Sequence, residues 1–245
     1  MDHAHALDNN LALYQAVLDA HGIQGTLDAH VWFTTEPVPP YYSHLLTRSG
    51  HEGVDAHMAR LGALAAAPPA SGWTFKDGFA TLDADALRAL GLHPFLEGRW
   101  YGLPAGHEAY GGTETDLTFA PVTDSATLAQ WEAVWTVSSP TDGVRVFPDA
   151  CLQDIRLAFL AALDARGALV GGVLANLSRE AVGVSNVFCT DAIPAASFAR
   201  DAVRAVARRH PDRHVVGYEL GEGGAALHPL APVDLGPLRI YRAAP

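Results

Sequence analysis

Residues with catalytic potential are scattered along this chain of 245 residues and do not form a familiar catalytic motif. Among the twelve histidines, His3 and His5 lie at the start of the chain, and His51 and His57 are too far apart to be two ligands on one helix face. The motifs His-Glu-x-x-His and Gly-x-Ser-x-Gly are both absent from the sequence. We therefore expect neither a metal centre nor a serine hydrolase.

The only lysine, Lys76, stands beside Asp77 in the alternating segment 73–79, which is typical of a strand. A charged pair of this kind keeps an edge strand soluble, and this is the interpretation that we favour. The alternative is that Lys76 lines a cleft between two halves of the protein. The other basic residues are arginines, and those around 200–213 are expected to form a solvated helix face. They are Arg200, Arg204, Arg208, Arg209 and Arg213.

The composition is that of a folded, acidic protein with a substantial core. Hydrophobic residues make up 49% of the chain, and 27 acidic against 16 basic residues give a net charge of −11. Such a charge repels phosphate backbones, so a nucleic-acid partner is not expected. Two cysteines are too few for a disulfide framework or a zinc cluster. We find no apolar run that could span a bilayer and no leader-like start, so we expect a cytoplasmic protein with no membrane partner and a frayed N-terminus.

The elements that would position these side chains alternate between helix and strand. The first half has a helix at 54–66, a strand at 73–79, a short helix and a strand at 95–101. The same order recurs in the second half, with a helix at 197–209, a strand at 215–220, a short helix and a strand at 235–241. The offset between the two sets is about 140 residues, which indicates an internal repeat. We predict an α/β fold of two halves, residues 1–112 and 113–245, each with a mixed sheet flanked by helices.

The second half, residues 116–242, resembles the GCN5-related N-acetyltransferase (GNAT) family. The resemblance rests on the helix after the first strand, the hairpin turn at 164–167 and the strand that ends Asn-Val-Phe-Cys at 186–189. It rests also on the long helix after that strand and on the ending at 228–242. The first half is similar to a truncated copy, so the whole chain resembles a degenerate tandem member of that superfamily.

The resemblance implies acetyl-CoA as a co-substrate. In this family two neighbouring strands splay apart and bind the pantetheine arm, and the pyrophosphate binds the N-terminus of the following helix, whose free N–H groups and dipole favour an anion. Here the stretch at 190–197 lacks the glycines of the family's pyrophosphate loop. The cofactor-binding residues that the resemblance implies are Val187, Phe188, Cys189, Ala195, Ala196 and Ser197.

The resemblance also implies which residues would transfer protons. Glu219 ends a strand that borders the family's acceptor cleft, which suits a general base, and its alternative is a solvated carboxylate. His228 lies in the region where the family has a tyrosine that acts as the general acid, so His228 is a candidate for that role. The alternative interpretation is that His228 is a surface histidine without a catalytic role. Cys189 lies near the expected thioester, although a small buried filler is the interpretation that we favour.

Two functions therefore stand as hypotheses. The first is transfer of an acetyl or related acyl group from coenzyme A to an amine on a small molecule, with the first half walling the acceptor pocket. The second is a non-catalytic ligand-binding or scaffolding protein, because the glycine-rich loop and the tyrosine are missing. An opening between the strands at 181–189 and 215–220 would favour the transferase.

Overall fold

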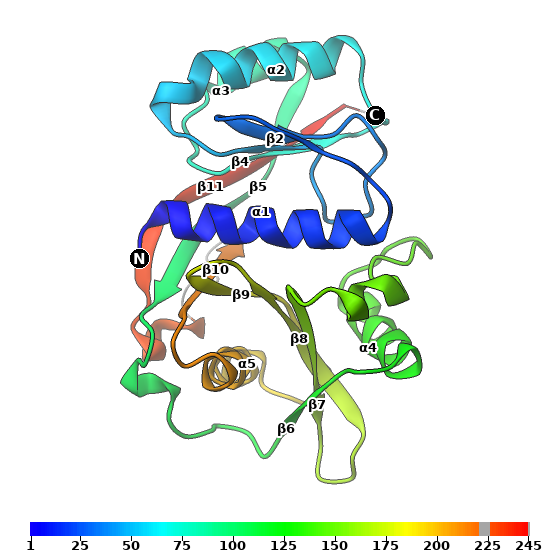
Figure 1. The fold of residues 1–245 in the computed structure, drawn as a ribbon, viewed down its shortest axis with the longest axis vertical. Coiled ribbons are helices and arrows are strands. Elements are labelled where there is room, and N and C mark those ends of the chain that lie inside the picture. The colour runs from blue at the N-terminus through cyan, green and yellow to red at the C-terminus, as the bar shows by residue number, and fades with distance from the viewer. Residues whose placement is uncertain (221–225, 245) are drawn as a thin grey trace.

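The chain folds around one mixed sheet, seen in a computed structural model that describes residues 1–220 and 226–244. Within these residues, eleven strands form the sheet and helices cover both of its faces (Figure 1). The predicted α/β fold with a mixed sheet flanked by helices is confirmed. None of the helices in the described part of the chain is long and apolar enough to cross a membrane.

The elements follow one another in an order that alternates between helices and strands. Those before residue 112 are α1 (His3–Ala20), β1 (Thr26–Leu27), β2 (Val31–Phe33), β3 (Leu45–Thr47), η1 (His51–Gly53), α2 (Val54–Ala66), β4 (Thr74–Asp77), α3 (Ala84–Ala89), β5 (Leu92–Leu103) and η2 (Glu108–Tyr110). Those after it are β6 (Thr118–Pro121), α4 (Ser125–Ser138), η3 (Asp149–Gln153), β7 (Leu157–Leu163), β8 (Leu169–Leu177), β9 (Ala181–Cys189), α5 (Ala195–Arg209), β10 (His214–Leu220), η5 (His228–Leu230) and β11 (Val233–Ala243).

Helix α1 begins at His3, so the expectation of a frayed N-terminus is wrong. The Asp2 side chain accepts a hydrogen bond from the backbone N–H of His5, and the His5 ring accepts one from the backbone N–H of Asp2. This reciprocal capping box satisfies backbone donors that a helix end leaves free. The buried side of α1 includes Asn9 and Asn10, which is why the segment resembles a polar tail in the sequence.

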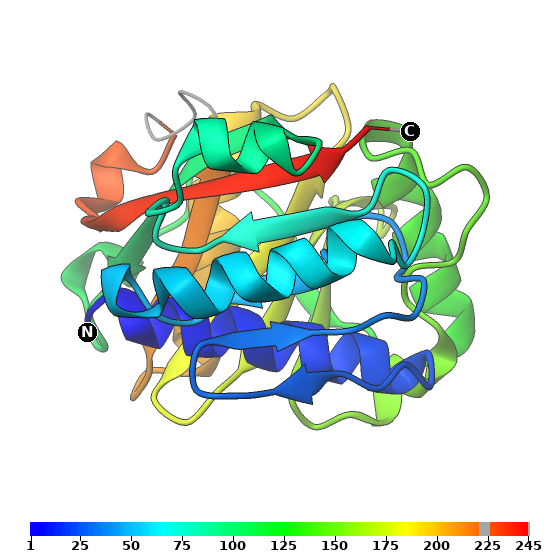
Figure 2. The ribbon, with the colours of Figure 1, turned by 90° about the horizontal axis from the view of Figure 1, so that it is seen from above.

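The helices divide between the two faces of the sheet. Apolar side chains of α1 and α4 pack together on one face, whereas α5 packs against β7 to β10 and α2 and α3 against β3 and β4 on the other. In Figure 1, α1 runs across the middle of the molecule, with α2 and α3 above it and α4 and α5 below. Figure 2 shows α2 in front of β4 and α1 behind it. Helix α1 therefore covers the region where the two parts of the sheet meet.

The last strand of each part of the chain pairs with strands of the other part: β11 lies beside β4, and β5 lies beside β10. The strand order is β1-β2-β3-β4-β11-β5-β10-β9-β8-β7-β6. Strand β11 lies between β4 and β5 and is antiparallel to both, and β5 is in turn antiparallel to β10. Strands from the two sides of residue 112 therefore interleave, and the division into two related halves stays a prediction.

A buried pair of amides joins α1 to the sheet. The Asn176 side chain donates to the backbone carbonyl of Asn9 at 2.8 Å and to its Oδ1 at 3.0 Å, and Asn9 Nδ2 donates to the Asn176 carbonyl at 3.1 Å. A Cβ atom at Gly183 would come within 2.1 Å of both side-chain oxygens, so a glycine is needed there. The amide pair holds α1 in one register over β8 and β9.

We expect Asn176→Ala to lower the free energy of unfolding by about 1–3 kcal/mol, because it leaves polar groups of Asn9 buried without a partner. Urea denaturation of the two proteins measures the difference. As a control, Val137→Ala alters a side chain that is 85% exposed and should change the value by less than about 0.5 kcal/mol. A loss for Asn176→Ala no larger than that of the control would contradict the role of the amide pair.

Candidate functional site

Strands β9 and β10 pair at one end only. Their parallel register covers Ala181–Gly183 on β9 and His214–Val216 on β10, and the remaining residues of both strands are not paired with each other. The opening that would favour a transferase is therefore present. It leaves backbone polar groups of the β9 edge facing the gap without a strand partner.

A bulge in β9 turns its side chains toward this opening. On β8 the paired residues advance from Gly172 to Leu174, while their partners on β9 go from Phe188 to Ser185, so β9 carries one extra residue. Asn186, in this extra stretch, has a left-handed backbone with φ of 49°. Side chains of a regular strand alternate between faces, but a bulge breaks the alternation. Ser185, Asn186 and Val187 consequently all line the same cavity.

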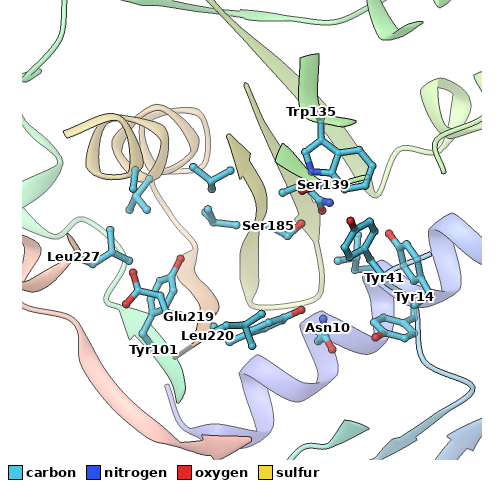
Figure 3. A pocket seen from close by; sticks show the side chains of 18 residues that line it. Asn10, Tyr14, Tyr41, Tyr101, Trp135, Ser139, Ser185, Glu219, Leu220 and Leu227 are labelled. Atoms are coloured by element: carbon cyan, nitrogen blue, oxygen red, sulfur yellow. The ribbon is translucent and has the colours of Figure 1, made fainter. Parts of the chain in front are cut away.

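This main cavity has a volume of about 400 Å³ and lies between β9, β10, α5, α1 and the end of α4 (Figure 3). Its size is within the range of small-molecule sites. Five of the chain's seven tyrosines line it. They are Tyr14, Tyr41, Tyr42, Tyr101 and Tyr218. Apart from the adjacent Tyr41 and Tyr42, these residues come from distant segments, so their spacing in the sequence carries no signal that they would converge.

Glu219 lies at one end of the main cavity together with Tyr101 (Figure 3). Burial raises the pKa of Glu219 above its ordinary value. Burial also raises the pKa of Tyr101, and the negative charge of Glu219 adds to this effect. The Tyr101 hydroxyl lies against Gly217 of β10, where an added Cβ atom would come within 2.5 Å of it. A half-buried carboxyl group and a buried phenol thus line the main cavity together beside the open end of β10.

His228 lines a different cavity, of about 210 Å³. Glu219 and Tyr101 line both cavities, whereas His228 lines only the smaller one. The two residues that were predicted to transfer protons therefore meet at the smaller cavity, and only Glu219 also lines the main cavity.

The sequence matches no protein-family model and no curated protein. Similarity is found among solved structures. A GCN5-related N-acetyltransferase from Kribbella flavida superposes with a TM-score of 0.67 at 12% identity, over 97% of this chain and 95% of that one. The chain has the GNAT fold. The match spans almost the whole chain, which is more than the second half on which the sequence resemblance rests.

Two further structures support the same fold. A functionally unknown conserved protein from Staphylococcus epidermidis has a TM-score of 0.62 at 13% identity, over 94% of this chain and 98% of that one. A GNAT-family protein from Novosphingobium aromaticivorans has a TM-score of 0.55 at 10% identity, over 96% of this chain and 99% of that one. At identities this low, the structural similarity shows a shared fold.

The residues predicted to bind the cofactor occupy the end of β9 and the start of α5. Val187 lines the main cavity and is 38% exposed. The Phe188 side chain is buried in the core, and the Cys189 thiol is partly buried, 3.7 Å from the Ile193 carbonyl. Only Val187 of the three thus presents its side chain to the main cavity.

Helix α5 of the GNAT fold begins without a side-chain cap. Pro194 precedes it, and the next two residues, Ala195 and Ala196, are exposed. The first N–H groups of a helix have no partner within the helix, so this end can receive an anion. The Ser197 hydroxyl accepts a hydrogen bond from the Arg200 guanidinium at 3.3 Å.

Lys76 is 1% exposed, on a strand that lies between β3 and β11, so the interpretation as an edge-strand residue is wrong. Its Nζ donates to Asn10 Oδ1 at 3.0 Å and lies 4.2 Å from the centre of the Tyr218 ring and 5.1 Å from that of Tyr14. Burial lowers the pKa of Lys76, but the two tyrosines raise it, and the balance lies above the ordinary value. A cation therefore lies beneath the wall of the main cavity, held by an amide and aromatic faces.

The arginines of α5 hold a neighbouring segment, which differs from the expected solvated face. Arg200 and Arg204 both pair with Glu114, and together they lower the pKa of that carboxyl to about 2. Arg208 donates to the carbonyl of Gly112 at 3.0 Å. These contacts hold the polar segment 111–117, between η2 and β6, along α5.

The raised pKa of Glu219 predicts a pH effect on stability. Because the folded protein holds this proton to a higher pH than the unfolded chain does, the stability that the protonated carboxyl contributes is lost as the pH rises. We expect Glu219→Gln to gain free energy of unfolding relative to wild type, more at about pH 7 than at about pH 4, in urea denaturation.

Glu108→Gln, which removes one exposed negative charge from η2, is the control for this comparison. The same difference between Glu219→Gln and wild type at both pH values would contradict the prediction.

Proposed function

We propose that this protein transfers an acetyl or related acyl group from coenzyme A to an amine of a small molecule. The observation that carries the proposal is the opening between β9 and β10, where residues of both strands line a cavity of about 400 Å³. The helix that follows β9, α5, begins without a side-chain cap. The GNAT fold, which the K. flavida N-acetyltransferase shares, supports the same activity.

The residues around the opening fit acetyl-CoA. The free edge of β9 offers backbone groups to an extended amide-containing arm such as pantetheine, beside Val187. The N–H groups at Ala195, Ala196 and Ser197 would hold the diphosphate, because short side chains leave these groups accessible without glycine. When bound, the coenzyme supplies the activated acyl thioester.

The proton transfers are assigned to Glu219 and Tyr101. Glu219 takes the proton that the amine loses as its nitrogen bonds to the acyl carbon, and its raised pKa makes it a stronger base than an exposed glutamate. Tyr101 gives its proton to the sulfur that leaves, since its raised pKa keeps the phenol protonated. Glu219, whose charge acts on Tyr101, can return a proton to it, so the pair is regenerated. The alternative general acid is His228, which lines the smaller cavity together with Glu219 and Tyr101.

A non-catalytic ligand-binding protein is the second candidate. The stretch 190–197 has no glycine, and it carries the exposed Asp191 close to the start of α5. Calorimetric titration of acetyl-CoA into the purified protein separates the two candidates. Binding at micromolar concentrations supports the transferase, and no binding supports the alternative.

The start of α5 can be tested with a charge. We expect Ala196→Glu to abolish the rise in Tm that acetyl-CoA causes, because the carboxylate repels the diphosphate. The same carboxylate favours the helix dipole, so the protein without ligand should be no less stable. Ala126→Glu, which alters the equivalent second residue of α4, is the matched control and should keep the ligand-induced rise in Tm. Loss of the rise in both variants, or in neither, would count against a diphosphate site at α5.

The assigned base is tested by steady-state kinetics. We expect Glu219→Gln to lower kcat by about 100-fold or more, with the affinity for acetyl-CoA unchanged, since general base catalysis contributes about 10²–10⁴-fold. The wild-type kcat should rise with pH as the Glu219 carboxyl ionises, and this rise should be absent in Glu219→Gln. A variant that keeps the wild-type kcat and pH profile would remove Glu219 from the mechanism.

A further inference from the structure

A second large cavity, of about 510 Å³, adjoins the main one. It is formed by the Pro-rich segment 38–44, the turn before β4, the adjacent parts of β5 and β11, and residues 140–142. The two cavities share four lining residues, so one layer of side chains at most separates them. The shared residues are Tyr41, Tyr42, Tyr218 and Leu220. We call the second cavity the aromatic chamber.

Aromatic rings line much of this chamber. Tyr42 and Trp73 are buried in its wall, and Phe95 and Tyr41 stand at its edge with 44% and 54% of their surface exposed. Tyr218 belongs to the wall shared with the main cavity. Rings exposed at the edge of a cavity can close over a flat apolar ligand, and ring-to-ring contacts favour an aromatic ligand beyond the area that it buries.

The polar groups of the chamber do not select for a charged ligand. Burial lowers the pKa of His44 to about 4, with the Thr74 carbonyl acting in the opposite direction, so the ring is neutral near pH 7. In the described part of the chain neither nitrogen of His44 has a hydrogen-bond partner. Asp142 and Arg242 add one charge of each sign, and the Arg242 guanidinium stacks 3.6 Å from the centre of the Phe95 ring. The interior is therefore suited to an uncharged ring.

We infer that the aromatic chamber holds the acyl acceptor and that this acceptor is an amine carrying an aromatic ring. The ring would lie among Tyr42, Trp73 and Phe95, and the amine would extend past the shared wall into the main cavity. Glu219 lines that cavity, so the amine would reach the proposed base. The inference rests on the proposed function and names its substrate class.

A pair of matched amines tests the inference by isothermal titration. The probes are 2-phenylethylamine and 2-cyclohexylethylamine, which have the same amine and nearly the same size but differ in aromaticity. We expect the phenyl compound to bind about threefold to tenfold more tightly, as is typical of aromatic contacts in proteins. Equal affinities, or tighter binding of the cyclohexyl compound, would overturn the inference.

Three variants locate the site. We expect Phe95→Ala, which removes a half-exposed ring, and Leu96→Trp, which fills the chamber, each to weaken binding of 2-phenylethylamine by about threefold or more. Neither should alter the affinity for acetyl-CoA. Leu27→Ala changes an apolar residue of β1 that is 48% exposed and lies away from the chamber, and it should leave both affinities unchanged.

The outcomes separate this inference from the proposed function. If acetyl-CoA binds and phenylethylamine does not, or if it binds with no effect of Phe95→Ala and Leu96→Trp, the chamber is not the acceptor site, although the acyltransferase proposal stands. If phenylethylamine binding depends on both residues while acetyl-CoA fails to bind, the chamber is supported as an amine site and the acyltransferase proposal fails.

Discussion

The hydrogen bonds that β11 makes along both of its edges are the interaction on which the rest of the structure depends. They place the end of the chain between β4 and β5, and β5 is thereby set against β10. Residues from the start, middle and end of the sequence become neighbours in this way. Lys76 of β4, Trp100 of β5 and Tyr218 of β10 all meet on the face that α1 covers. Without the interleaved strands there would be no wall between the main cavity and the aromatic chamber.

The candidate site arises where the regular pairing of the sheet is interrupted. Strands β9 and β10 stop pairing after Gly183 and Val216, and the bulge at Asn186 turns consecutive side chains toward the gap. Helix α1 then covers one side, held in register by Asn9 and its partner in β8. A sheet without these interruptions would satisfy its own backbone and leave no edge for a ligand.

Local patterns in the sequence predict the elements of the second half well. The hairpin around 164–167, the strand at 181–189 and the helix at 197–209 are present as β7 and β8, β9, and α5, because each depends on periodicity and turn residues close in sequence. The start of α1 was missed because asparagines occupy part of its buried side. The exchange of β5 and β11 was also missed, since the choice of strand partner is set by distant residues.

The side chains of the candidate site also differ in whether local sequence patterns could identify them. Glu219 could be singled out because it ends a recognisable strand, and it does line the main cavity. Tyr101 and Lys76 could not, because their importance comes from neighbours about 100 residues or more away, such as Gly217 and Tyr218. Patterns of hydrophobicity show that a residue belongs to a strand, but they do not show which side chains of distant strands will become its neighbours.

The burial of Lys76 has a chemical consequence for a protein that would handle reactive acyl thioesters. It is the only lysine in the sequence, and it is sealed beneath aromatic rings with 1% of its surface exposed. Every other basic side chain that could face the solvent is an arginine or a histidine. The folded chain therefore presents no lysine to amine-directed electrophiles, so cross-linkers and N-hydroxysuccinimide dyes would find no ε-amine on its outside, and stray acylation of its own lysine would require the fold to open.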